Sequence, residues 1–155
     1  MTTLYALAQR ERHLVVGTGN KIEDFGVGFY TKYGDGGVDL SPIADLTKTE
    51  VFSLGAHLNV LQDIQNAVPT DGLWGDDRTD EDQLGATYPE LEWAMAWEAQ
   101  HAAMTEDVKQ RLLHELPGRQ QEVLSIYRRF HGANLHKMQP IPVCEIPESL
   151  RVSAG

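Results

Sequence analysis

The stretch LVVGTGN at residues 14–20 decides the fold class of this chain. Three apolar residues, two of them β-branched, lead directly into a turn that contains two glycines. A short apolar run of this kind is typical of a buried strand in a parallel sheet, with a functional loop at its carboxyl end. The stretch therefore predicts an α/β fold of the Rossmann-like type, in which residues 14–16 form a buried strand.

Glycine placement and helical periodicity divide the remaining sequence into two parts. Seven of the fourteen glycines fall between residues 17 and 37, which predicts a segment made mainly of loops. After residue 45 the pattern becomes mostly helical, and TKTE at 47–50 has the spacing of a capping box. The expected helices are 3–11, one from 47 onward, 61–68, one from 89 onward, 105–116 and 119–135.

A single strand cannot form a sheet, because a buried parallel strand needs a neighbour on each side. Residues 24–43 have room for only one or two more strands. We therefore expect residues 1–143 to be the C-terminal part of a larger parallel-sheet domain, opening inside a helix. Residues 144–155 are expected to form a tail.

The composition is that of a globular protein with an acidic surface. The chain has 155 residues, and 13 basic against 23 acidic residues give a net charge of −10, which disfavours binding to nucleic acid. No apolar run approaches the roughly 20 residues of a membrane-spanning helix, and the first residues lack a signal-peptide pattern. A lone cysteine, Cys144, fits a reducing compartment. We expect a cytoplasmic protein with no nucleic-acid or membrane partner.

The first candidate site is the turn that follows the expected strand. Glycines in GTGN at 17–20 allow backbone amides to approach an anion, and Glu23 could hold Mg²⁺ on the next turn. The alternative is an ordinary strand-to-helix turn with a surface glutamate.

The second candidate site is YTKYGDGGVD at 30–39, which combines a cation, two carboxylates, two aromatic rings and three glycines. This density favours a ligand-binding loop over the alternative, a glycine-rich hairpin whose charges are solvated.

Further candidates lie along the helical part of the chain. Lys48 stands in the first turn of a helix, where a bound anion would offset the unfavourable interaction with the helix dipole. Thr70 could bind a phosphate oxygen or simply cap a turn. The acidic run at 76–82 is expected to be a solvated loop. His136 and Lys137 stand beside a proline-rich segment, where an ordinary surface role is the alternative.

Taken in order, these segments resemble NAD synthetase, the ammonia-using member of the N-type ATP pyrophosphatases, which have an adenine-nucleotide alpha-hydrolase-like fold. The resemblance extends to about residue 143, and its most specific element is TKYGDGG. The matching motifs are GTGNxxE at 17–23, TKYGDGGVD at 31–39, PIxxLxK at 42–48, PT at 69–70, DExxLGxxY at 80–88 and HK at 136–137.

The resemblance implies a ligase that converts deamido-NAD to NAD. ATP would adenylate the nicotinate carboxylate, and ammonia, free or derived from glutamine, would then displace AMP. The residues implied are Thr18, Lys48 and Thr70 for ATP, Glu23 for Mg²⁺, Lys32, Asp39, His136 and Lys137 for deamido-NAD, and Asp35 near the reacting groups. A homodimer is implied as well.

The sequence also departs from the family pattern. The phosphate-binding loop SGGxDS of the family does not occur in residues 1–155, and with it a Mg²⁺ ligand is missing. We therefore expect this chain to be inactive by itself. The alternatives are a non-catalytic module that binds a nucleotide or a partner, one half of a split enzyme, and an unrelated helical domain.

Overall fold

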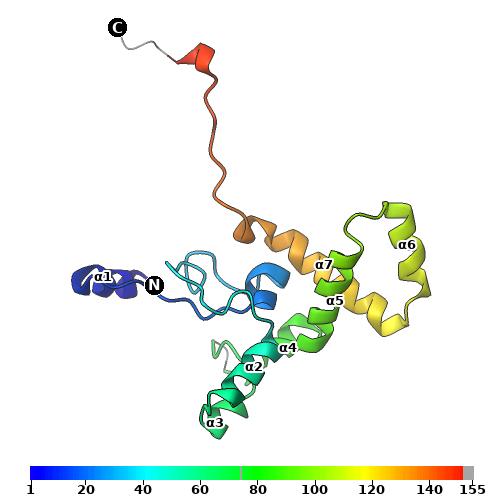
Figure 1. Ribbon diagram of the computed structural model, residues 1–155, viewed down its shortest axis with the longest axis horizontal. Coiled ribbons are helices and arrows are strands. Elements are labelled where there is room, and N and C mark those ends of the chain that lie inside the picture. Colours follow the sequence, from blue (N-terminus) through cyan, green and yellow to red (C-terminus); the bar gives the residue numbers. More distant parts are fainter. Residues whose placement is uncertain (74, 152–155) are drawn as a thin grey trace.

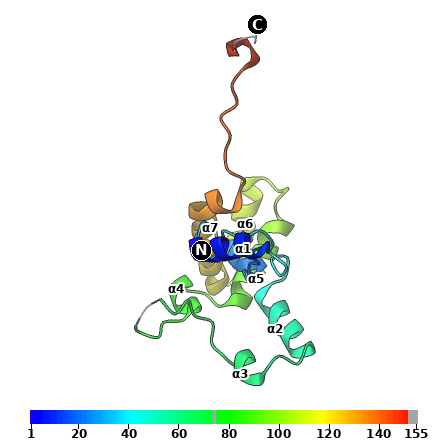
Figure 2. The same cartoon turned by 90° about the vertical axis from the view of Figure 1, so that its left-hand side faces the viewer.

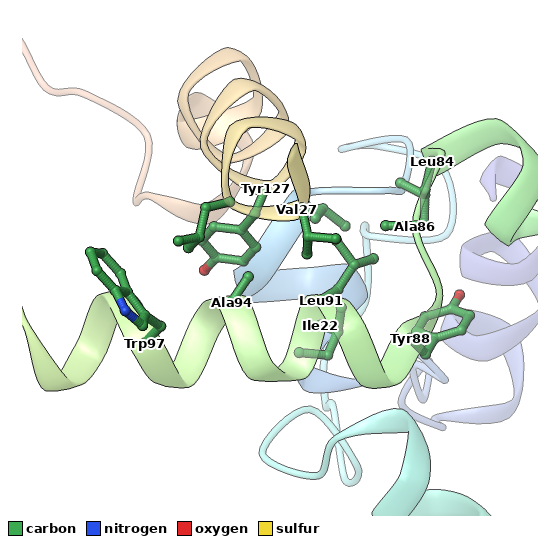
Figure 3. Close-up of a cluster of buried hydrophobic side chains, with 11 residues drawn as sticks. Ile22, Val27, Leu84, Ala86, Tyr88, Leu91, Ala94, Trp97 and Tyr127 are labelled. Atoms are coloured by element: carbon green, nitrogen blue, oxygen red, sulfur yellow. The ribbon is translucent and has the colours of Figure 1, made fainter. Parts of the chain in front are cut away.

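The apolar pattern of the helical part produces a three-element core. The computed structural model describes residues 1–73 and 75–151. In it α5 (Tyr88–Gln100) and α7 (Gly118–Met138) pack against each other and against η1 (Ile22–Val27), a turn of π-helix (Figure 1). The buried side chains form one cluster (Figure 3): Ile22, Val27, Leu84, Ala86, Tyr88, Leu91, Ala94, Trp97, Val123, Leu124 and Tyr127.

The other helices lie at the edge of this core or away from it (Figure 1). They are α1 (Thr2–Glu11), α2 (Lys48–His57), α3 (Gln62–Gln65), α4 (Asp80–Leu84), α6 (Glu106–Glu115) and the 3₁₀ turn η2 (Glu148–Leu150). Helices α2 and α3 form an arm, and the segment after α7 runs away from the helices in both views (Figures 1 and 2). Residues 152–155 of the expected tail lie outside the described part.

Helix starts follow local side-chain chemistry. The capping box expected at Thr47 is present, since its hydroxyl accepts from the Glu50 amide while the Glu50 carboxylate accepts from the Thr47 amide. Two further capping boxes, at Thr79 and Thr87, start α4 and α5. The acidic run at 76–82 is thus only partly a loop, because α4 begins at Asp80. The expected 61–68 helix is shorter, and the last helix extends three residues further than expected.

The expected buried strand at 14–16 is reduced to one isolated parallel bridge between Val16 and Leu40. The Gly17 amide donates to the Leu40 carbonyl at 2.7 Å. Val15 is buried, but Leu14 and Val16 are 67% and 54% exposed. A parallel strand needs partners on both edges, and the described residues supply one neighbour on one edge. The parallel sheet expected from the sequence is therefore not formed within them.

Apolar side chains remain uncovered at the N-terminal end of the described chain. Helix α1 buries no residue, and Leu4 and Leu7 are about half exposed. Together with Leu14 and Val16 they border an open hollow of about 380 Å³. Clustered exposed apolar surface of this kind marks an interaction face more often than a free one. No helix in the described ranges is long and apolar enough to cross a membrane.

The core predicts that replacing a buried leucine lowers the free energy of unfolding much more than replacing an exposed one. Leu91 is fully buried between η1 and α7, so Leu91→Ala should lower the free energy of unfolding by about 3 kcal/mol. Leu58→Ala, at a side chain that is 64% exposed, should change it by less than about 0.5 kcal/mol. Urea unfolding followed by circular dichroism measures both values, and equal losses would contradict this core.

The start of α5 predicts a dependence of stability on pH. Arg119 donates two hydrogen bonds to Glu90, and this contact holds the pKa of Glu90 at about 2. Because the folded-state pKa lies below the unfolded one, the stabilisation is complete above about pH 5 and is lost as the pH falls towards 2. Glu90→Gln should therefore cost about 1 kcal/mol at pH 7 and less at pH 3. Urea unfolding at the two pH values tests this, and a pH-independent cost would contradict it.

Candidate functional site

The GTGN turn fixes the position of Glu23. The side-chain oxygen of Asn20, which is 2% exposed, accepts hydrogen bonds from the amides of Ile22 at 2.9 Å and Glu23 at 3.2 Å. In return the Glu23 carboxylate accepts from the Asn20 amide at 3.2 Å. These reciprocal bonds start η1, and burial of Ile22 beneath it leaves Glu23 facing α2 and α5.

Glu23 is the centre of a cluster of four side chains, which we call the Glu23 cluster: Glu23, Lys48, Asp80 and Tyr88. The ammonium group of Lys48 lies 2.9 Å from Glu23 Oε1, and both side chains are less than one-fifth exposed. The Tyr88 hydroxyl lies 2.7 Å from the same Glu23 oxygen and 3.1 Å from Asp80 Oδ2. Two carboxylates thus share one hydroxyl and one cation.

Burial governs the electrostatics of this cluster. Burial raises the pKa of Tyr88 above its ordinary value, and the neighbouring Glu23 charge adds to the effect. Burial likewise raises the pKa of Asp80, while the Tyr88 hydrogen bond and the Lys48 charge oppose that shift. Asp80 Oδ1 is buried and has no hydrogen-bond partner among the described residues. The cluster holds more negative charge than its own cation offsets.

Thr70 lies beside the Glu23 cluster. The carbonyl of the preceding Pro69 accepts from the Asp80 amide at 3.1 Å, and Thr70 and Lys48 line the same hollow of about 530 Å³. The Thr70 hydroxyl donates to the Arg78 carbonyl and accepts from the Gly72 amide, so it also holds its own turn. Lys48 thus pairs with Glu23 and also shares with Thr70 the wall of this hollow, whose other lining residues are mostly apolar.

The glycine-rich loop at 31–37 is fixed to the end of α7. Lys137 donates to the carbonyls of Gly28 at 2.8 Å and Tyr30 at 2.7 Å. Lys32 donates to the backbone carbonyl of His136 at 2.6 Å. These bonds bring the two motifs together although about 105 residues separate them.

Two contacts fix the backbone path of the glycine-rich loop. Asp35 accepts from the Thr31 amide at 2.8 Å. A Cβ on Gly36 would lie 2.4 Å from the Tyr30 ring, so only glycine fits there. A hollow of about 700 Å³ opens between the loop and α7, with Tyr30, Asp35 and Lys137 in its wall. Its size suits an organic ligand.

Three remaining candidates are not among the residues that line that hollow. Asp39 accepts from the Val15 amide at 2.9 Å and from the Tyr5 hydroxyl at 3.2 Å, so its contacts here are structural. Thr18 is exposed in the GTGN turn. His136 is exposed too, and its described contact with Lys32 uses the backbone.

Sequence reasoning assigned no role to three residues of the site. Asp80 and Tyr88 belong to a motif that it recognised only as a pattern. Asp24 was overlooked, although it directly follows Glu23. It packs under Gly19, and burial together with the charges of Glu23 and Asp35 raises its pKa to about 6. The sequence signal for Asp24 is that two carboxylates, Glu23 and Asp24, stand side by side after the GTGN turn.

The carboxylates present are suitable oxygen ligands for Mg²⁺, and the partnerless Asp80 oxygen shows that negative charge here is incompletely neutralised. No group of three or more His, Cys, Asp or Glu side chains with metal-binding geometry occurs in the described ranges. Mg²⁺ commonly takes one or two protein carboxylates and completes its shell with water and phosphate oxygens. Glu23 fits that mode of binding.

Comparison with known proteins places the chain in a family. The profile described as "NAD synthase" matches residues 1–140. The chain belongs to the NAD synthase family. Among the curated relatives, NH(3)-dependent NAD(+) synthetase of Alkaliphilus metalliredigens is 40% identical over 144 residues, covering 92% of this chain and 50% of the relative. The same enzyme of Mesoplasma florum is 43% identical over 114 residues, covering 74% and 44%.

Solved structures of NAD synthase relatives share the fold. NMN synthetase from Francisella tularensis is 30% identical with a TM-score of 0.71. The aligned region covers 94% of this chain and 52% of the Francisella chain. NH3-dependent NAD synthetase from Campylobacter jejuni has a TM-score of 0.61 at 21% identity, covering 94% and 51%, and shows the fold alone. The chain spans about half the length of the curated relatives it matches.

The contacts of Lys137 predict that this residue orders the glycine-rich loop. Lys137→Met removes two charge-assisted hydrogen bonds to buried carbonyls, so the free energy of unfolding should fall by about 2 kcal/mol. Amide hydrogen exchange should accelerate in residues 29–37. Lys109→Met in α6 removes the same charge elsewhere and serves as the control. Unchanged exchange in the loop would contradict the assignment.

Proposed function

We propose that the chain supplies the Glu23 and Lys48 side of an ammonia-dependent NAD synthetase, which converts deamido-NAD to NAD at the expense of ATP. The observation that carries the proposal is the ion pair of Lys48 with Glu23, at the edge of a hollow that Lys48 lines together with Thr70. A cation, a metal-binding carboxylate and a hydroxyl are the groups that a polyphosphate requires.

The role of each residue follows from its chemistry. Lys48 would leave Glu23 for a phosphate oxygen of ATP, Thr70 would donate a hydrogen bond to the phosphates, and Thr18 would contact ATP from the exposed turn. Glu23 would hold Mg²⁺, which when bound neutralises phosphate charge and favours loss of pyrophosphate.

Deamido-NAD would occupy the hollow between the glycine-rich loop and α7. Lys137 offers positive charge at its wall, and Lys32, which donates to the His136 carbonyl, lies at the same end of α7. Asp35 lies in the same wall, where its carboxylate could attract ammonium and accept the proton that it must lose, so that ammonia attacks the adenylated carboxyl carbon and displaces AMP. For Asp39 a direct contact would require release from Val15 and Tyr5.

The proposal extends to the arrangement of the protein. Residues 1–143 would form the synthetase portion and 144–155 a tail. Following the family resemblance, we expect ATP, deamido-NAD and ammonia as ligands, a homodimer as the assembly and the cytoplasm as the location.

A partner-binding module is the second candidate function, and one observation favours it. The half-exposed leucines of α1, with Leu14 and Val16, form an apolar face around the 380 Å³ hollow. A polypeptide that carries the SGGxDS loop could cover this face and complete the active site. The two functions are then compatible, since this chain would contribute its half of a split enzyme.

The proposal predicts conditional activity. The purified chain with ATP, Mg²⁺, ammonium and deamido-NAD should form no NAD above background, because each missing transition-state contact costs roughly 2–4 kcal/mol. Adding the SGGxDS-containing half of the Alkaliphilus relative should yield NAD, measured by coupled alcohol dehydrogenase fluorescence. In that mixture Lys48→Met and Glu23→Gln should each lower the rate at least 30-fold, whereas Asp107→Asn in α6 should not.

The outcomes separate the two functions. Robust NAD formation by the chain alone would contradict the expected inactivity. Complex formation without NAD, shown by co-elution on gel filtration, would favour the partner-binding module. Full activity of Glu23→Gln would overturn the assignment of the metal-binding carboxylate.

A further inference from the structure

Asp80 is the one buried residue in the described ranges with a side-chain oxygen that lacks a hydrogen-bond partner. The residue is 7% exposed, and its other oxygen contacts the Tyr88 hydroxyl at 3.1 Å. A buried carboxylate oxygen without a partner is costly. Its retention beside a Lys–Glu pair needs a physical reason.

Tyr88 cannot satisfy both carboxylates of the Glu23 cluster. Its hydroxyl has one proton, and the shorter contact, 2.7 Å, is to Glu23. Tyr88 lies at the start of α5, at the edge of the apolar cluster (Figure 3). Asp80 is therefore only weakly neutralised by this hydroxyl.

Lys48 is placed to reach either carboxylate. Its ammonium group pairs with Glu23 and lies 4.8 Å from the centre of the Tyr88 ring, on whose face a cation is attracted. The Lys48 charge also acts on Asp80. The ring thus attracts the ammonium on the residue whose hydroxyl contacts both carboxylates.

We propose that Asp80 is a positioning residue that accepts Lys48 when a divalent cation displaces it from Glu23. Without a cation, Lys48 pairs with Glu23, and one oxygen of Asp80 has no hydrogen-bond partner. When the cation binds Glu23, the ammonium moves across the Tyr88 ring to Asp80, so that the two positive charges separate. Lys48 then stays paired with Asp80 until its ammonium group binds a phosphate oxygen. The inference rests on the proposed role of Glu23.

The exchange predicts how cation affinity responds to substitution. Asp80→Asn preserves shape but removes the negative charge that would pair with the displaced ammonium, so Mn²⁺ affinity should fall about tenfold. In the Lys48→Gln background the same substitution should change affinity by less than about threefold, because no ammonium then needs an acceptor. Asp107→Asn, which removes an equal charge from α6, should leave affinity unchanged. Free Mn²⁺ measured by electron paramagnetic resonance gives each dissociation constant.

The double-mutant comparison distinguishes the exchange from simpler roles. An equal loss in both backgrounds would show that Asp80 acts directly on the cation, and this would overturn the exchange. An unchanged affinity of Asp80→Asn would overturn it as well. A crystal structure of the unsubstituted chain with Mn²⁺ tests it without any variant. In that structure the Lys48 ammonium should lie within 4 Å of an Asp80 carboxylate oxygen. A Lys48 ammonium that is still paired with Glu23 would contradict the proposal.

Glu23→Gln separates this inference from the proposed function. Loss of Mn²⁺ binding in Glu23→Gln, with Asp80→Asn behaving like the unsubstituted chain, would refute the exchange alone. No Mn²⁺ binding by the unsubstituted chain, or unchanged binding by Glu23→Gln, would overturn the metal-binding role of Glu23 and the exchange with it.

Discussion

Burial of one face of η1 is the constraint on which the site depends. Ile22 and Val27 are fully buried against α5 and α7, and Gly26 is buried with them, so that Glu23, Asp24 and Phe25 face away from the core. This places Glu23 against Lys48 and Tyr88, and Asp24 under the GTGN turn. A one-residue shift of η1 would bury a carboxylate in the apolar core, which is far more costly than any local rearrangement. The core thus sets the geometry of the charged groups.

Local chemistry made much of the helical part predictable. The TKTE pattern at 47–50 forms the capping box that its spacing indicates, α5 begins one residue before Pro89, and α6 begins directly after Thr105. The motifs also predicted Glu23, Lys48 and Thr70 as site residues, because they occur in the family order, and these roles stay predictions. The pairing of Lys48 with Glu23 is nevertheless a tertiary property that no single motif contains.

The failures have a different physical origin. A strand at 14–16 depends on neighbours, and its apolar pattern says nothing about whether they are within the same segment of chain. The ligand role of Asp39 stays a prediction, and its motif gave no sign of the bond to the Val15 amide, between residues 24 apart in sequence. Asp80 was invisible as a functional residue, because only its burial and its free oxygen set it apart from the other acids at 76–82.

The bonds from Lys32 and Lys137 connect the glycine-rich loop to the final turns of α7, where helix ends normally fray. Order in the loop and order at that helix end are consequently one cooperative property. A carboxypeptidase that removed the chain as far as Lys137 would loosen the glycine-rich loop, which lies about a hundred residues earlier in the sequence. A ligand seated between them would, in turn, protect the helix end from digestion.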